Sequence, residues 1–187
     1  HTPGEELPDC LVVHPGLSPL AGRGLPELTG AGVAFHLLWA LRELLGEEPP
    51  LDYTDLAALG TIADVAPLLG ENRALIREGL ARLPDSRWPG VRASVAQARL
   101  GPEVTAHQVA FVIAPRLNAA GRLGEAELGL ELLTTGSERR ARELAVYLDA
   151  RNQQRRKLQD EMYAEALTKA DPSAPALVLE DDGWHPG

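Results

Sequence analysis

The sequence predicts a helix-rich α/β fold, and three observations lead to this prediction. Alanine and leucine are the commonest of the 187 residues, whereas aromatic residues make up only 4%. Most apolar residues recur at helical spacing between residues that commonly cap helices. Two short apolar runs, residues 11–13 and 176–179, are instead bounded by turn-forming residues, which is typical of strands. With 44% hydrophobic residues, the chain can build a core.

The first part of the chain predicts a strand, a loop and a helix. The strand over residues 11–13 runs into a turn, and the glycine and proline residues of 16–28 predict a loop. Thr29 is a suitable cap for a helix over 31–45. Gly46 then provides the usual end of a helix.

The middle of the chain predicts further helices. An apolar run over 52–59 predicts a helix that ends at Gly60, and residues 72–83 predict another that ends before a proline. Residues 84–104 are less regular, although 91–100 have a helical pattern. Thr105 is a suitable cap for the next helix.

That helix is expected to end at Ile113, where a proline follows closely. Residues 116–122 then predict a loop, and residues 124–133 predict a helix. Ser137 is a suitable cap for the longest predicted helix, over 138–169. The apolar stripe of this helix is interrupted by Arg151, Asn152 and Arg155. A helix that is polar all round in its middle often bridges two domains.

One carboxylate, Asp64, lies among apolar residues in the sequence L-G-T-I-A-D-V-A-P-L over 59–68. Burying such a carboxylate is unfavourable unless a positive group accompanies it. The candidates are a metal ion, an arginine or backbone N–H groups. A helix or turn cap is the alternative interpretation, because aspartate commonly binds nearby amides.

A second candidate site lies in A-P-R-L-N-A-A-G-R-L over residues 114–123. Arg116 and Arg122 flank Asn118, and small residues between them would let backbone approach a ligand closely. Arginine is suited to forked binding of phosphate oxygens. The alternatives are an ordinary loop with solvated arginines, or an Arg116 that pairs with a core carboxylate.

The charge distribution limits the classes of partner. A net charge of −9 argues against a general nucleic-acid-binding surface, but seven of the 18 basic residues lie within 138–157, beside three acidic ones. This basic segment either contacts a nucleic-acid strand or solvates an exposed helix. The single Cys10 excludes an internal disulfide, and no apolar run could span a bilayer. We therefore expect a cytoplasmic protein with no membrane association.

Several segments together carry a family resemblance. The most specific are G-T-I-A-D-V-A-P-L at 60–68 and P-R-L-N-A-A-G-R-L at 115–123. The others occur in the expected order: H-T-P-G at 1–4, V-V-H-P at 12–15, T-G-A-G-V-A-F at 29–35 and G-W-H-P-G at 183–187. This set resembles RecJ, the single-strand-specific 5′→3′ exonucleases of the DHH phosphoesterase superfamily. Before the proline of V-V-H-P, the family more often has asparagine than histidine.

The resemblance implies an organisation in three parts. Residues 1–136 would form the latter part of a DHH catalytic domain with a parallel sheet, and 137–170 a long connecting helix. Residues 171–187 would form a linker and the first strand of a DHHA1-type domain. Because the chain begins at a histidine and stops within a recognisable segment, we expect a piece of a longer protein that is inactive alone.

The resemblance also implies the chemistry. The intact protein would hydrolyse single-stranded DNA from the 5′ end in repair and recombination, using a two-metal site with Mn²⁺ or Mg²⁺. Asp64 matches a metal-binding aspartate, and His1 matches a histidine beside the scissile phosphate. Arg116, Asn118 and Arg122 are the candidates for holding DNA phosphates. Single-stranded DNA, a single-strand-binding protein and a recombination helicase are the expected partners.

Two other functions stay open from the sequence. One is a phosphodiesterase of the same superfamily that acts on short oligonucleotides or cyclic dinucleotides. The other is a RecJ-like module that binds DNA or a replication complex without catalysis.

Overall fold

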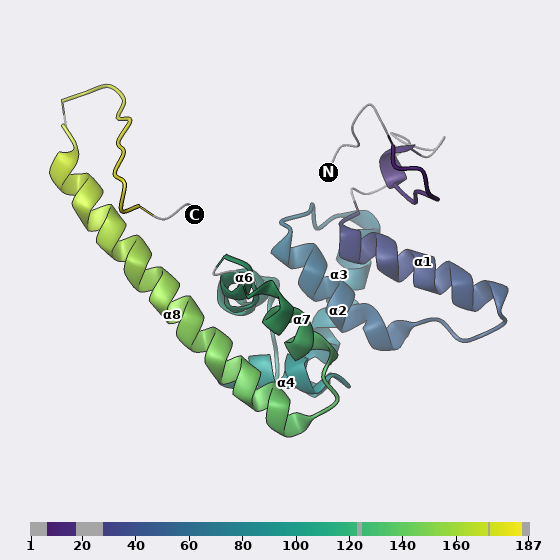
Figure 1. The fold of residues 1–187 in the computed structure, drawn as a ribbon. Helices are drawn as coiled ribbons and strands as arrows, with labels where there is room; N and C mark the ends of the chain where they lie inside the picture. The colour runs from purple at the N-terminus through teal and green to yellow at the C-terminus, as the bar shows by residue number, and fades with distance from the viewer. Residues whose placement is uncertain (1–6, 18–27, 123–124, 172, 185–187) are drawn as a thin grey trace. The chain divides into compact units, whose positions relative to one another are not determined.

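The computed structural model describes residues 7–17, 28–122, 125–171 and 173–184, without the side chains of Ala120 and Arg122. All regular structure in these residues is helical (Figure 1). The principal helices are α1 (Gly30–Leu44), α2 (Thr54–Ala63), α3 (Gly70–Arg82), α4 (Pro89–Gln97), α6 (Ala114–Arg122), α7 (Ala126–Thr134) and α8 (Glu138–Lys169). They form two compact units, one within His1–Arg87 and Ala98–Ala114 and the other within Trp88–Gln97 and Pro115–Gly187.

The two predicted strands are absent. Residues 11–13 and 176–179 have no strand conformation, and Leu11 and Val178 are 94% and 99% exposed. A strand needs a neighbouring strand to satisfy its backbone N–H and C=O groups, and the described residues supply none. The strands expected at these positions are therefore not seen in the part of the chain that the structure describes.

The predicted start and end of α1 are confirmed. The Thr29 side chain accepts a hydrogen bond from the Gly32 N–H at 3.1 Å, as an N-cap does. After Leu44, Gly46 has φ of +70°, a conformation that glycine adopts without strain.

Helix α2 is longer than predicted, because Gly60 lies inside it and not at its end. A Cβ atom at Gly60 would lie 2.4 Å from the Cβ of Ala31 in α1. Glycine is needed here because α1 and α2 approach closely. Beside this crossing, the hydroxyls of Thr29 and Thr61 lie 3.2 Å apart and form a buried hydrogen bond.

Residues 116–122 are helical, so the predicted loop is also wrong. Val109–Ile113 form a π-helical turn directly before α6, and Pro115 lies in the first turn of α6. The Ala114 N–H donates to the Val109 oxygen, and this wider π-turn changes the register of the hydrogen bonds just before Pro115, so the helix continues past a residue that has no N–H. Pro115 therefore does not break the chain here.

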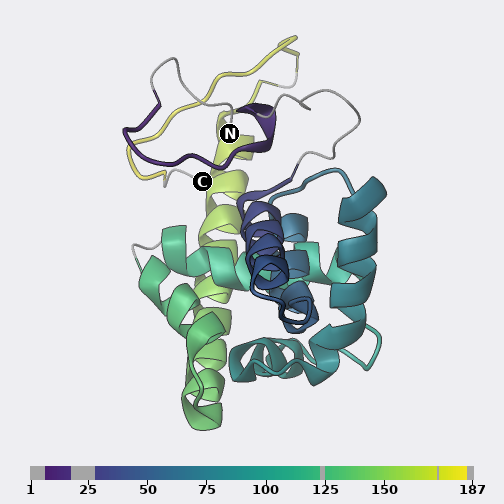
Figure 2. The same cartoon turned by 90° about the vertical axis from the view of Figure 1, so that its right-hand side faces the viewer.

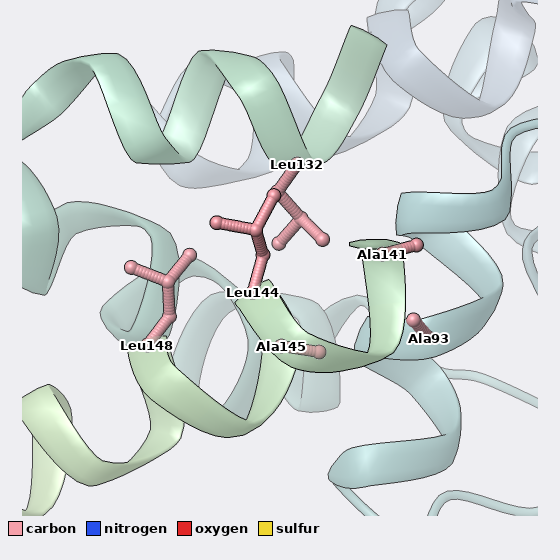
Figure 3. Close-up of a cluster of buried hydrophobic side chains, with 6 residues drawn as sticks. All are labelled: Ala93, Leu132, Ala141, Leu144, Ala145 and Leu148. Atoms are coloured by element: carbon pink, nitrogen blue, oxygen red, sulfur yellow. The ribbon is translucent and has the colours of Figure 1, made fainter. Parts of the chain in front are cut away.

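The second unit has its core between α4, α7 and the first half of α8. Six side chains form this cluster (Figure 3): Ala93, Leu132, Ala141, Leu144, Ala145 and Leu148. A Cβ atom at Gly90 would lie 1.6 Å from the backbone oxygen of Leu132, so α4 and α7 are in direct backbone contact.

Helix α8 is one uninterrupted helix in both views (Figure 1, Figure 2), and its predicted bounds are confirmed. Ser137 caps it by accepting a hydrogen bond from the Arg140 N–H. All of its buried residues lie between Ala141 and Asn152. In the second half, apolar side chains such as Leu167 are exposed. None of the described helices is both long enough and apolar enough to cross a membrane.

Candidate active site

Asp64 lies at the C-terminal end of α2 in the first unit. Its backbone N–H donates to the Gly60 oxygen at 3.1 Å, and its side chain is exposed. Among the residues that the structure describes, no group forms a hydrogen bond or an ion pair with the Asp64 carboxylate. The apolar neighbours in the sequence do not bury the side chain. The alternative of a side-chain cap is not seen either.

The turn after Asp64 contains a valine, Val65, in the left-handed backbone conformation. The Val65 N–H donates to the Ile62 oxygen at 3.1 Å, and the Ala66 N–H donates to the Thr61 oxygen at 3.4 Å. This is the hydrogen-bond pattern that usually ends a helix with a left-handed glycine. Here Val65 takes that position with φ of 57°, which is strained for a β-branched residue. Strained backbone often occurs at functional sites.

Asn72 holds the segment that follows the turn. This residue of α3 is fully buried, and its side-chain NH₂ donates to the Pro67 backbone oxygen at 3.0 Å. The end of α2, the turn at Val65 and this hydrogen bond together fix the course of the chain on both sides of Asp64. Sequence reasoning did not identify Asn72 as a contributor, because an asparagine in a helix carries no sign of a distant backbone acceptor.

Arg116 lies in α6 of the second unit and pairs with Asp149 of α8. The Arg116 Nε lies 2.7 Å from Asp149 Oδ1, and the two side chains are 22% and 13% exposed. The sequence left open the alternative that Arg116 pairs with a core carboxylate, and the structure contains such a pair. The pair does not test a role in phosphate binding, because a guanidinium carries five N–H donors.

The other predicted phosphate-binding residues are less well defined. Asn118 is exposed and forms no hydrogen bond within the described part of the chain. It lies two residues from Arg116 on the same helix, so the two side chains do not face each other. The Arg122 side chain and the whole of His1 lie outside the described residues. Asp64 belongs to one unit, whereas Arg116 and Asn118 belong to the other.

The basic segment of α8 is largely neutralised by acidic side chains. Arg140 binds both carboxylate oxygens of Glu131, at 2.6 and 2.7 Å, and this contact lowers the pKa of Glu131. Ion pairs also engage Arg139, Arg142, Arg151 and Lys157. Arg155 and Arg156 have no carboxylate partner among the described residues. These pairs favour a solvated helix for most of the segment.

The described histidines have structural surroundings. His14 Nδ1 accepts a hydrogen bond from the Gly16 N–H at 3.0 Å, within a turn. The rings of His36 and Phe35 pack in a T-shaped arrangement, and the ring centroids of His107 and Phe111 lie 4.6 Å apart. Within the described ranges, no group of three or more histidine, cysteine, aspartate or glutamate side chains could hold a metal ion. A metal site that includes Asp64 would therefore need ligands from outside the described residues.

Comparisons with known proteins agree on one family. No family model matches the chain. RecJ of Thermus thermophilus is 55% identical over 188 residues, which cover all of this chain and 27% of that protein. RecJ of Dickeya dadantii is 40% identical and RecJ of Bacillus subtilis is 39% identical, with 36% and 24% of those proteins covered. The chain thus spans about a quarter to a third of the length of these relatives, which are named as single-stranded-DNA-specific exonucleases.

Solved structures give the same result. A crystal structure of T. thermophilus RecJ in complex with Mn²⁺ matches all of this chain with a TM-score of 0.91 and 53% identity, over 28% of that chain. A RecJ structure bound to manganese matches with a TM-score of 0.89, and 47% of that chain is covered. The T. thermophilus complex with Mg²⁺ matches 92% of this chain, and 27% of that one, with a TM-score of 0.84. Over its whole length, the chain is therefore homologous to part of RecJ, the family of single-stranded-DNA-specific exonucleases.

Proposed function

We propose that this chain is part of a metal-dependent exonuclease that degrades single-stranded DNA from the 5′ end, in repair and recombination. The names of the relatives support the substrate and the reaction, and the Mn²⁺ and Mg²⁺ complexes of similar structures support the metal. The observation that carries the proposal is Asp64. Its carboxylate is exposed, has no protein partner among the described residues and is held at the end of α2.

Asp64 has the properties of a metal ligand. Mn²⁺ and Mg²⁺ prefer carboxylate oxygens, and no group among the described residues competes for the oxygens of Asp64. When bound, a pair of such cations supplies an activated water and stabilises the developing negative charge on the phosphate. The contribution of this chain is to present one carboxylate from a fixed position. The residues that complete the metal site would lie outside the described part of the chain.

Arg116, Asn118, Arg122 and His1 are proposed to contact the DNA phosphates. An arginine guanidinium can bind two phosphate oxygens through parallel N–H bonds. Arg116 already has its Nε bound to Asp149, so its orientation is restricted before any substrate arrives. His1 is proposed to lie beside the scissile phosphate.

The domain arrangement belongs to the same proposal. Residues 1–136 would complete a DHH-type domain whose parallel sheet includes strands from elsewhere in a longer protein. The helix over 137–170 would connect it to a DHHA1-type domain that begins within 171–187. Single-stranded DNA, a single-strand-binding protein and a recombination helicase are the proposed partners, in the cytoplasm.

An exonuclease assay on the full-length protein that carries this chain tests the proposal. The substrates are 5′-phosphorylated single-stranded DNA and a dinucleotide, each with Mn²⁺. We expect mononucleotide release from the 5′ end that falls at least about a thousandfold in Asp64→Ala, because the metal site loses a ligand. Asp85→Ala is the matched control, since Asp85 is also an exposed aspartate of the first unit without a described partner.

Two outcomes would contradict the proposal. Cleavage of the dinucleotide alone would assign the protein to the small-substrate phosphodiesterases. DNA binding without cleavage of either substrate would assign it to the non-catalytic binding modules.

A further inference from the structure

The Asp149 carboxylate occupies an unusual environment in the middle of α8. The Asp149 side chain is 13% exposed and accepts hydrogen bonds from three other side chains. Arg116 Nε binds Oδ1 at 2.7 Å, whereas the amides of Gln97 and Gln153 bind Oδ2 at 3.1 and 3.0 Å. These donors come from three helices, α6, α4 and α8. The carboxylate therefore accepts hydrogen bonds from side chains of all three helices.

The Arg116–Asp149 pair differs from the other ion pairs of α8. Arg139–Glu143 is a pair one helical turn apart whose side chains are 82% and 46% exposed. Such surface pairs contribute little to stability and restrict little. The Arg116 and Asp149 side chains are only 22% and 13% exposed, so their interaction is less screened by water. The two residues also lie 33 positions apart in sequence, so their pairing links different helices.

Stability alone is a weak explanation for this pair. Removing two charges from water is unfavourable, and a buried pair can often be replaced by apolar residues without a loss of stability. A buried pair does restrict the relative orientation of its two side chains. A bond through Nε restricts the plane of the guanidinium, a group that carries five N–H donors in a fixed arrangement.

We propose that Asp149 is a positioning residue, which holds the Arg116 guanidinium in the orientation that binds a phosphate of the DNA substrate. This inference rests on the proposed function of Arg116. Gln97 and Gln153 bind the second carboxylate oxygen and thereby keep Oδ1 directed at Arg116. Asp149 acts on the substrate only through Arg116.

The charge of Asp149 is maintained at neutral pH. Burial raises the pKa of its carboxyl, but the hydrogen bonds from Gln97, Arg116 and Gln153 and the charge of Arg116 outweigh this effect, so the pKa lies below its ordinary value. Asp149 is therefore ionised when the enzyme works, and Arg116 faces a full negative charge.

A double-mutant cycle in the full-length protein tests the proposal. The variants are Arg116→Ala, Asp149→Asn and the combination, with 5′-phosphorylated single-stranded DNA and Mn²⁺. We expect Arg116→Ala to lower kcat/KM about ten- to a hundredfold, the range of one charge-assisted hydrogen bond. We expect Asp149→Asn to lower it about three- to tenfold, mainly through KM, and the combination to match Arg116→Ala alone.

The control is Asp160→Asn, which removes the same charge from an exposed position of the same helix. It should leave kcat/KM unchanged. Asp149→Glu retains the charge and should therefore lower kcat/KM less than Asp149→Asn does. If Asp149→Asn does not fold, Asp149→Glu takes its place in the cycle, and its smaller effect should likewise vanish when Arg116 is alanine.

The outcomes separate the two proposals. If Arg116→Ala lowers kcat/KM and Asp149→Asn has no effect, or an effect that multiplies with that of Arg116→Ala, the positioning role is wrong and the phosphate contact stands. If Arg116→Ala leaves kcat/KM unchanged, the phosphate contact is wrong and the positioning role falls with it, although the exonuclease activity itself remains.

Discussion

Asp64 and Asp149 lie at opposite ends of the range of environments that a carboxylate can have in a protein. Asp64 is surrounded by apolar residues in the sequence, yet its side chain is exposed and unpaired among the described residues. Asp149 lies in a basic segment of the sequence, yet it is nearly buried and receives three hydrogen bonds. Neighbours along the chain therefore predict the wrong environment for both residues.

The difference follows from their positions in helices. Asp64 lies at the end of α2, where the chain leaves the packed helix and side chains are free to point outward. Asp149 follows Leu148 in the buried part of α8. Because Leu148 packs in the core, Asp149 is also placed where little of it is exposed. A carboxylate can remain there only if donors meet it. The first environment suits binding of an added cation, and the second suits fixed orientation of a protein side chain.

The largest effect is expected from removing the packing beside Asp149. Leu148 is 1% exposed and belongs to the core cluster of the second unit. Leu148→Ala should lower the free energy of unfolding by about 3 kcal/mol, from lost burial and the cavity left behind. Urea unfolding measures this change. A loss below about 0.5 kcal/mol, as for a surface substitution, would mean that this face of α8 is not packed.

Removing the buried carboxylate should have the next largest effect. Asp149→Ala leaves the Arg116 guanidinium without the Asp149 counter-charge and removes the acceptor that the side-chain amides of Gln97 and Gln153 share. We expect the free energy of unfolding to fall by about 2 kcal/mol. Asp64→Ala should change it by less than about 0.5 kcal/mol, since the exposed carboxylate has no described bond to lose. Equal effects of the two substitutions would remove the distinction between the sites.

A smaller effect of opposite sign is expected beside Asp64. Val65 has φ of 57° and is 87% exposed, so it contributes strain and little packing. Asparagine tolerates this conformation, and Val65→Asn should raise the free energy of unfolding by about 1 kcal/mol. The thermal unfolding temperature measures this change. A decrease would show that the side chain of Val65 makes a packing contribution larger than the strain.

The pH dependence of stability should show the smallest effect. The folded-state pKa of Asp149 lies below the ordinary value of 3.8, because the bonds from Gln97, Arg116 and Gln153 outweigh burial. Its stabilising contribution is complete above the ordinary pKa and is lost as the pH falls through the folded-state pKa. The wild-type protein should therefore lose more unfolding free energy than Asp149→Asn between about pH 5 and about pH 2. Equal losses of unfolding free energy in the two proteins over this pH range would contradict a lowered pKa of Asp149.

Local signals predicted part of this fold. The caps at Thr29 and Ser137, the glycine after α1 and the bounds of α8 depend on residues close in sequence, and the structure confirms them. The predictions that failed concern Gly60 and the loop expected over 116–122. Gly60 was expected to end a helix, but it serves a crossing with Ala31, which is far away in sequence.

Strands and the surroundings of the site depend on distant parts of the chain. The apolar runs at 11–13 and 176–179 have the composition of strands but no neighbouring strand among the described residues. Asp64 is proposed as a site residue from its motif, whereas nothing near it in sequence indicates the hydrogen bond from Asn72 to Pro67. The pairing of Arg116 with Asp149 stayed one of several alternatives, because residues 33 positions apart leave no local pattern.

Binding of Mn²⁺ is the most direct test of the claim that Asp64 is a metal ligand. Isothermal titration of the full-length protein with Mn²⁺, compared with Asp64→Asn, measures affinity and stoichiometry apart from catalysis. We predict that Asp64→Asn loses one bound ion or raises its Kd more than about tenfold, with an unchanged unfolding temperature. Equal affinity and stoichiometry in the two proteins would show that the exposed carboxylate at the end of α2 does not hold the metal.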